Sequence, residues 1–566
     1  MKTLQTDYDK LAELLLPNIH KTPEDWERQY PERNLPKGAQ VTRLAPSPTG
    51  FIHLGNLFGA LTDERVAHQS GGVFYLRIED TDAKREVEGA VETVIDVLRY
   101  FGIEFDEGAG TEHVVEASLD AGAGSTTSYG PYFQRQRAEI YQTYAKDLIR
   151  KGKAYPCFCT EEELNEIKEK QAAANILTGY HSSFAKCRNL TYEEVEARVQ
   201  AGQSFVIRLR SRGKEDGRIT FTDIIKGEIS FPENMQDIVI LKSDGIPTYH
   251  FAHAIDDHLM RTTLVVRGDD WLSSVPIHLE LFEVLGFAPV QYAHTANLMK
   301  MDGVSKRKLS KRKDPELSLD FYRKDGYHPQ CVKVYLMTLL NSNFEEWYDK
   351  HPGVPITDFK FDVHKMTQAG ALFDMEKLHS ICRNEFAKMD IDTIYDFLYS
   401  WAKEYAPNIF DLYFQDEDYM KKIIGLFAGA GQKRRRKDFE YASQMMKLFG
   451  FFFDETFSPC YEFKYGMDTV CKIVDNYLAT YDHTVDNNGW FQRVKKVAET
   501  CGFASDMKDY KVAPGQYKGS VADVAEILRI IITGSPNSPD LWSILQIMGE
   551  KKMRARLNQI SVLCRE

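Results

Sequence analysis

The stretch "RLAPSPTGFIHLGN", residues Arg43–Asn56, places two prolines, two glycines and a histidine between two regular elements. Before it, QVTRLA has a strand pattern; after it come a helical pattern over residues 57–68 and a second apolar strand pattern, GGVFYLRIED. Strand, helix and strand in this order indicate a βαβ unit of a parallel sheet. In such sheets ligands bind beyond the carboxyl ends of the strands, where a helix N-terminus offers N–H groups to phosphate. The stretch therefore predicts an α/β fold and a ligand site together.

Composition limits the class of protein. The 566 residues exceed what one hydrophobic core usually supports, so several domains are expected. No apolar run approaches the length of a membrane span, and the first residues lack the pattern of a signal peptide. Nine thinly spread cysteines do not form a disulfide framework. We therefore expect a cytoplasmic protein with no membrane partner. A monomer is the expected state, although composition leaves the oligomeric state open.

The net charge of -12 argues against a nucleic-acid partner on average, but basic segments interrupt it. They are KRKLSKRK at 306–313, KRRRK at 433–437 and KKMRAR at 551–556. A solvated surface is the alternative interpretation of each segment. Within the first of them, Lys308 and Lys311 flank Ser310 on a polar loop and are suited to contact a triphosphate.

Taken alone, His53 is explained by a structural role without any ligand, and the lysines are explained by a basic surface loop. Together with four further motifs, the two segments resemble the class I aminoacyl-tRNA synthetases, and among them the glutamyl-tRNA synthetases of the bacterial type. The motifs are RLAPSPTGFIHLGN at 43–56, RIEDTD at 77–82, PTYHFA at 247–252, DDHLM at 256–260, VRGDD at 266–270 and KLSKR at 308–312. The resemblance is dense over residues 39–340 and fades beyond residue 400.

The resemblance implies a Rossmann-type parallel-sheet catalytic domain with an inserted α+β domain that binds the tRNA acceptor arm, followed by mainly helical C-terminal domains. The expected ranges are 1–38 for an N-terminal extension, 39–150 and 241–335 for the two halves of the catalytic domain, 151–240 for the insertion, 336–400 for a helical connecting domain and 401–566 for a helical anticodon-binding domain.

The resemblance also implies roles for single residues. Those expected to act in catalysis through the ATP phosphates are His53, Asn56, Lys308 and Lys311. Those expected to bind glutamate are Arg43, Ala45, Ser47, Glu79, Tyr249, His253 and Arg267. Further contacts to ATP are expected from Gly55, Asp257, Asp270, Trp271 and Leu298. Two alternatives stay open: in one the aspartates only cap helices, and in the other Glu79 and Arg267 form a salt bridge at the sheet edge.

The insertion contains Cys157, Cys159 and Cys187, with Tyr180 or His181 as a fourth donor. Tetrahedral zinc takes four such ligands, and some members of the resembled family hold zinc here. A structural Zn²⁺ and a metal-free cluster both remain open.

The reaction implied is that of a glutamate-tRNA ligase, which uses ATP with Mg²⁺ to attach L-glutamate to tRNA(Glu). Whether tRNA(Gln) is also charged is left open. A glutaminyl-tRNA synthetase is a second candidate, although RxDDTN is then expected where RIEDTD stands. A nucleotidyltransferase sharing the HxGH turn, a shorter enzyme that glutamylates a tRNA nucleoside and a non-catalytic tRNA-binding module are further candidates.

Overall fold

The computed structural model describes residues 2–48, 52–82, 84, 86–110, 129–429 and 435–563. Residues 49–51 of the opening stretch, most of the loop at 108–130, and Lys433 and Arg434 of the second basic segment lie outside them. The chain forms two compact units, one of residues 1–321 and 333–374 and one of residues 322–332 and 375–566.

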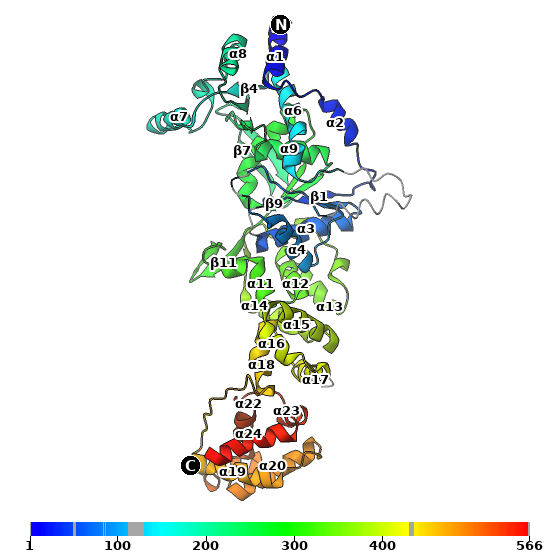
Figure 1. The fold of residues 1–566 in the computed structure, drawn as a ribbon, viewed down its shortest axis with the longest axis vertical. Coiled ribbons are helices and arrows are strands. Elements are labelled where there is room, and N and C mark those ends of the chain that lie inside the picture. Colours follow the sequence, from blue (N-terminus) through cyan, green and yellow to red (C-terminus); the bar gives the residue numbers. More distant parts are fainter. Residues whose placement is uncertain are drawn as a thin grey trace. The chain divides into compact units, whose positions relative to one another are not determined.

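A parallel sheet is the centre of the first unit (Figure 1). β2 (Val73–Leu76) lies between β1 (Val41–Leu44) and β3 (Glu107–Gly108), and β9 (Leu264–Gly268) pairs in parallel with β10 (Gln291–Thr295). β9 also lies beside β1, where the Thr263 N–H donates to the Val41 carbonyl at 2.9 Å. The strand order is β3-β2-β1-β9-β10, so successive strands are added on one side of β1 up to β3 and on its other side from β9 onward. The point between β1 and β9 is the topological switch point, where doubly wound sheets bind ligands. The predicted parallel-sheet fold is confirmed.

Along the chain, helices lie between the strands of this sheet. They are α3 (Leu54–Gln69), α4 (Ala90–Tyr100), α6 (Ala138–Arg150), α9 (Tyr249–Leu259) and α10 (Val275–Leu285). β1 is buried along its whole length, which agrees with a strand covered on both faces. Gly286 caps the C-terminus of α10, and its φ of 83° is the left-handed conformation that glycine tolerates.

The predicted insertion is divided between two sheets. β4 (Ala154–Cys157), β5 (Val206–Leu209) and β8 (Val239–Leu241) form a small antiparallel sheet, with α7 (Glu161–Ala173) and α8 (Tyr192–Gln200) in its connections. By contrast, the hairpin of β6 (Arg218–Asp223) and β7 (Gly227–Pro232) extends the main sheet, because β6 pairs with β10 at Asp223 and Tyr292. Part of the predicted insertion thereby contributes directly to the main sheet.

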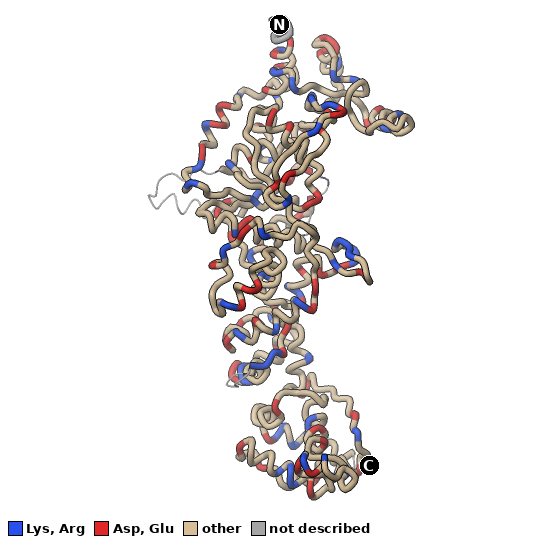
Figure 2. The backbone as a smooth tube through the Cα atoms, turned by 180° about the vertical axis from the view of Figure 1, so that it is seen from behind, with Lys and Arg blue, Asp and Glu red and all other residues tan. Residues whose placement is uncertain are grey.

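A second hairpin carries the KLSKR motif. β11 (Leu298–Asp302) pairs with β12 (Ser305–Lys308) on one side and β13 (Ala371–Leu372) on the other. Lysines and arginines gather on this hairpin (Figure 2). α11 (Leu319–Asp325), α12 (Pro329–Leu340) and α13 (Phe344–Lys350) follow.

The first 38 residues, predicted as an extension, pack on the rest of the first unit. α1 (Lys2–Leu15) lies along α6, and α2 (Pro23–Gln29) buries Trp26, whose indole N–H donates to the Thr143 hydroxyl at 3.1 Å. Arg33 forms an ion pair of 2.6 Å with Glu107 at the end of β3. The segment is thus part of the first unit's core.

The second unit is built of helices, as predicted for the C-terminal region (Figure 1). They are α14 (Met375–Phe386), α15 (Ile391–Tyr405), α16 (Pro407–Tyr413), α17 (Glu417–Ala428), α18 (Met445–Phe449), α19 (Met467–Thr480), α20 (Asn487–Cys501), α21 (Met507–Val512), α22 (Val521–Thr533), α23 (Leu541–Met548) and α24 (Glu550–Leu563). α19 packs against α20 and α24, and α22 against the same two helices. Among the helices of the described residues, none is long and apolar enough to cross a membrane.

The basic segment of α24 is largely engaged within its own unit. Arg556 is buried against Asp454, and Arg554 pairs with Glu550 at 2.7 Å. Lys552 donates to the Phe452 carbonyl at 2.8 Å. These contacts favour a structural role for the segment over the RNA contacts considered from its charge.

Candidate active site

A cavity of about 510 Å³ opens at the carboxyl ends of β1 and β9, where the order of the sheet reverses. Its wall contains most of the residues that the sequence singles out. They are Arg43, Ala45, Ser47, His53, Gly55, Asn56, Glu79, Tyr249, Arg267, Asp270, Trp271, Leu298, Lys308 and Lys311. Residues as far apart in the chain as Arg43 and Lys311 therefore meet in one place.

Two predicted residues, His253 and Asp257, do not line the cavity. Both side chains are fully buried on α9 and paired with each other, with His253 Nδ1 2.7 Å from an Asp257 carboxylate oxygen. Asp257 also pairs with Arg77 at 2.7 Å and with Arg43 at 3.3 Å. Burial opposes ionisation of Asp257, but the two guanidinium groups outweigh it and hold its pKa well below the usual range. In this structure Asp257 therefore anchors Arg43 and Arg77 from within α9.

Glu79 lies one residue beyond Ile78, past the end of β2, and its carboxylate is 3.3 Å from Arg77. Burial raises the pKa of Glu79 to about 7, although Arg77 and Arg43 favour its charged form. Arg77 is its ion-pair partner among the described residues, and the alternative pair with Arg267 is not formed. Glu79 is therefore a carboxyl group on the cavity wall with a pKa of about 7.

His53 and Asn56 begin α3 together. His53 is the N-cap residue, and its backbone N–H donates to the Asn56 side-chain oxygen at 3.0 Å. Burial, reinforced by Lys311 and Lys308, lowers the pKa of His53 to about 4, so its imidazole is neutral at pH 7. Because the oxygen of Asn56 serves the cap, its amide N–H groups remain as donors.

The positive charge at this end of the cavity comes from the KLSKR loop. Lys308 forms an ion pair with Asp270, and Lys311 is close enough to lower the pKa of His53. Arg307, the residue before Lys308, is directed elsewhere, to Asp302 and Asp314 at 2.9 and 2.6 Å. The loop is thus anchored by Arg307 while the two predicted lysines reach the cavity.

Aromatic and aliphatic side chains form the remaining wall. Tyr249 and Trp271 lie with ring centroids 4.5 Å apart, and Trp271 keeps 40% of its surface exposed. Leu298 begins β11 and lines the same cavity.

Sequence reasoning missed three polar residues of the wall, Asp63, Thr295 and Asn297. Asn297 directly precedes the predicted Leu298, so its position in the sequence could have identified it as a residue of the wall. Asp63 lies in α3 with its carboxyl buried and without a hydrogen-bond partner among the described residues, and burial raises its pKa well above the usual range. No sequence motif pointed to it.

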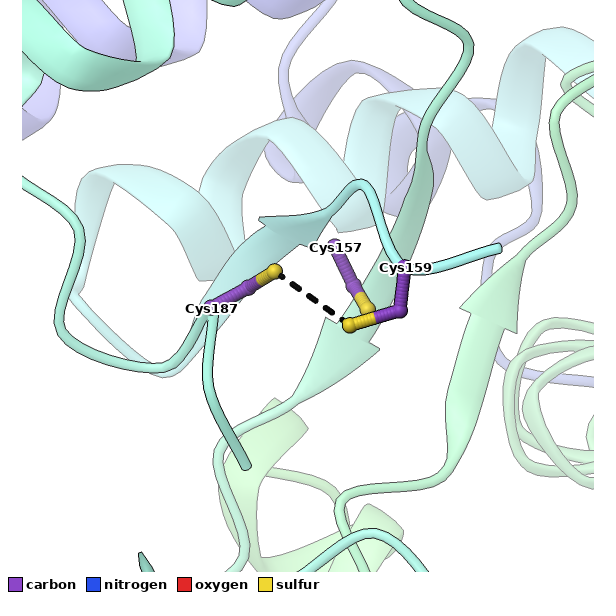
Figure 3. Close-up of side chains that lie close together, drawn as sticks. All are labelled: Cys157, Cys159 and Cys187. Carbon is purple, nitrogen blue, oxygen red and sulfur yellow. Dashed lines mark hydrogen bonds between the residues drawn. The ribbon is translucent and has the colours of Figure 1, made fainter. Parts of the chain in front are cut away.

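The three predicted cysteines converge in the insertion (Figure 3). Their sulfur atoms lie within 4.8 Å of one another, and those of Cys159 and Cys187 are 3.7 Å apart. The Tyr180 hydroxyl is 3.3 Å from the Cys159 sulfur. His181, the other suggested donor, hydrogen-bonds through Nε2 to the Leu177 carbonyl at 2.7 Å.

Comparison with known proteins covers both units. The family model described as the catalytic domain of class I tRNA synthetases (E and Q) matches residues 40–380, and a model for an anticodon binding domain matches residues 516–561. A glutamate–tRNA ligase from Acetivibrio thermocellus is 52% identical, over 98% of this chain and 100% of its own. One from Clostridium perfringens strain 13 is 48% identical, over 97% and 100%. A solved glutamate tRNA ligase from Elizabethkingia meningosepticum, in complex with its amino acid, has a TM-score of 0.72 at 27% identity, covering 92% of this chain and 99% of that one.

Proposed function

Because this chain belongs to the family of class I glutamate–tRNA ligases, we propose that its cavity activates L-glutamate with ATP and transfers the glutamyl group to the 3′ end of tRNA(Glu). The observation that carries this proposal is that two groups of side chains, suited to different substrates, line one cavity. We call each group a receptor. One end holds Arg43, Arg267 and Glu79, and the other holds His53 with the lysines of the KLSKR loop.

The first receptor suits an amino acid with two carboxylates. Arg43 and Arg267 offer planar guanidinium groups that bind carboxylates through paired N–H donors, and Tyr249 adds a hydroxyl. Glu79 is the counter-ion for the α-ammonium group. Ser47 and the backbone at Ala45 complete this end. His253 and Asp257 act through Arg43 and not by contact with substrate.

The second receptor suits the phosphates of ATP. His53 and Asn56 are neutral donors at the N-terminus of α3, so Lys311 and Lys308 supply the charge. Asp270 holds Lys308 until the nucleotide arrives. The backbone at Gly55 approaches the phosphates, while Trp271 and Leu298 enclose the adenine ring.

The chemistry needs no nucleophile from the protein. A carboxylate oxygen of glutamate attacks the α-phosphorus of ATP, and the bond to pyrophosphate breaks. Mg²⁺ bound with ATP would shield the phosphate charge. The terminal ribose hydroxyl of the tRNA then attacks the glutamyl carbonyl, loses its proton to solvent, and AMP leaves. Lys311 and the donors of α3 lower the barrier by stabilising the charge that develops on the phosphates.

We further propose that Cys157, Cys159 and Cys187 hold a structural Zn²⁺ with Tyr180 as the fourth donor. Zinc bonded to sulfur at about 2.3 Å with tetrahedral angles places two sulfurs about 3.8 Å apart. The distance between the sulfurs of Cys159 and Cys187, 3.7 Å, agrees with this requirement. Such a metal would brace the domain that receives the acceptor arm.

An aminoacylation assay tests the proposed function. The purified full chain is incubated with ATP, Mg²⁺ and separately purified tRNA(Glu) and tRNA(Gln), with labelled glutamate in one arm and labelled glutamine in the other. Glutamate esterified to tRNA(Glu) is the expected result, and glutamate on tRNA(Gln) as well would extend it. Esterified glutamine, or no esterified amino acid, would overturn it. A cytoplasmic monomer is the expected state of the enzyme.

A further inference from the structure

The two arginines of the amino acid receptor have different surroundings. Arg43 forms an ion pair with Asp257, whereas Arg267 has no ion pair with any carboxylate of the described residues. Arg267 donates instead to two imidazoles, to His294 at 3.0 Å and to His278 at 3.2 Å. Its guanidinium also lies 4.7 Å from the centre of the Tyr292 ring. It is therefore a buried cation, 8% exposed, held by neutral groups.

The hydrogen bonds fix the tautomer of each imidazole. Arginine only donates, so His294 Nε2 must accept and its proton must lie on Nδ1. That proton is donated to Asp223, 2.6 Å away. Likewise His278 accepts from Arg267 through Nδ1, so its Nε2 donates to His250, 2.8 Å away. Both chains of contacts keep Arg267 in one orientation without neutralising its charge.

The carboxylates nearest in the chain to Arg267 are each occupied elsewhere. Asp269 pairs with Lys226 at 2.9 Å, and Asp270 pairs with Lys308. Asp223, which lies behind His294, also accepts from the backbone N–H groups of residues 225 and 226, both at 2.9 Å. Asp223 and Lys226 belong to one turn, the β6–β7 turn at residues 223–227.

We propose that Asp223 and Lys226 of the β6–β7 turn are positioning residues for the amino acid substrate. Asp223 acts through His294 to orient Arg267, and Lys226 holds Asp269 away from Arg267. The guanidinium group is thereby left to pair with a carboxylate of glutamate. The inference rests on the proposed role of Arg267. It assigns this turn, which lies within the inserted segment, to the amino acid site.

Asp223→Asn tests the orientation of Arg267. An amide must direct its N–H₂ either at His294 Nδ1–H or at the backbone N–H groups, so one donor meets another donor in either orientation. We expect the KM for glutamate in aminoacylation to rise about 10- to 100-fold, the range for a lost hydrogen bond to a charged group, while the KM for ATP is unchanged. Lys226→Met frees Asp269 from its ion pair and is also expected to raise the KM for glutamate. It leaves the buried pair of Asp223 and His294 intact. Glu27→Gln is the matched control, because Glu27 accepts from His258 at 2.6 Å outside this network.

A double-mutant cycle separates a positioning role from a structural one. In an Arg267→Ala background, Asp223→Asn should add no further rise in the KM for glutamate, because its target is gone. Additive effects, or an unchanged KM in both Asp223→Asn and Lys226→Met, would overturn the inference. If Arg267→Ala itself leaves the KM for glutamate unchanged, the proposed role of Arg267 fails instead.

Discussion

The side-chain oxygen of Asn56 accepts a hydrogen bond from the backbone N–H of His53 at 3.0 Å, so the residue expected to contact ATP also caps the helix that carries it. The two tasks use different atoms. The cap needs the carbonyl oxygen of the amide, whereas phosphate needs its N–H donors.

Substitutions of Asn56 separate these tasks. Asn56→Ala removes the hydrogen bond to the N-cap residue His53 and should lower the free energy of unfolding by about 0.5–1.5 kcal/mol, as measured by denaturant titration. Asn56→Asp keeps an oxygen at the cap and should unfold like the parent chain. It loses the donors and adds negative charge, so the KM for ATP should rise about tenfold or more. If Asn56→Asp retains the parental KM for ATP, the amide does not contact the phosphates.

Glu79 predicts a pH dependence of glutamate binding. Its pKa near 7 in the folded protein means that the carboxylate needed for the α-ammonium is lost as the pH falls below 7. The KM for glutamate should therefore decrease as the pH rises from 6 to 8, while Glu79→Gln should have a high KM that does not follow this titration. The raised pKa has the opposite effect on stability: the free energy of unfolding falls between the ordinary pKa of 4.5 and about 7 as the pH rises, and Glu79→Gln removes that decline. Parallel pH profiles in the parent and the variant would contradict this role.

Trp26 predicts that the N-terminal segment stabilises the catalytic unit. The side chain is buried and hydrogen-bonded to the Thr143 hydroxyl, so Trp26→Ala should lower the free energy of unfolding by about 3–5 kcal/mol. Trp26→Phe keeps most of the ring volume and should lose much less. Thermal unfolding followed by circular dichroism distinguishes them. A Trp26→Ala variant as stable as the parent would mean that the segment is dispensable.

The cysteine cluster predicts one zinc ion per chain. Elemental analysis of the purified protein should find zinc, and Cys159→Ser should lose it and lower the unfolding temperature. Cys460→Ser is the control, because that thiol is exposed. Zinc that is absent from the parent chain, or unchanged in Cys159→Ser, would contradict the proposed site.

The sequence predicted the fold class and half of the residues that line the cavity, because the informative residues stand in local motifs at strand ends. Arg43, Glu79 and Arg267 each follow or end a strand pattern, and the carboxyl ends of parallel strands meet at one edge. The outcome for Asp257 depended on tertiary contacts that no local pattern encodes. Its partner Arg43 is 214 positions away in the chain.

The same limit applies to the β6–β7 hairpin. Its alternating pattern indicates strands, but not which sheet they join, and only the pairing with β10 brings Asp223 to His294. The packing of residues 1–38 was also outside the reach of sequence reasoning. Short helical patterns broken by prolines describe an extension and a docked segment equally well.

The central claim, that this cavity performs the reaction, is tested most directly by comparing Lys311→Ala with Lys313→Ala. Both lysines belong to the same exposed loop, but only Lys311 of the two lines the cavity. In aminoacylation of tRNA(Glu) with glutamate, Lys311→Ala should lower kcat about 10²- to 10³-fold, as expected for loss of a transition-state charge contact. Lys313→Ala should keep the parental rate. Equal rates in the two variants would contradict the account.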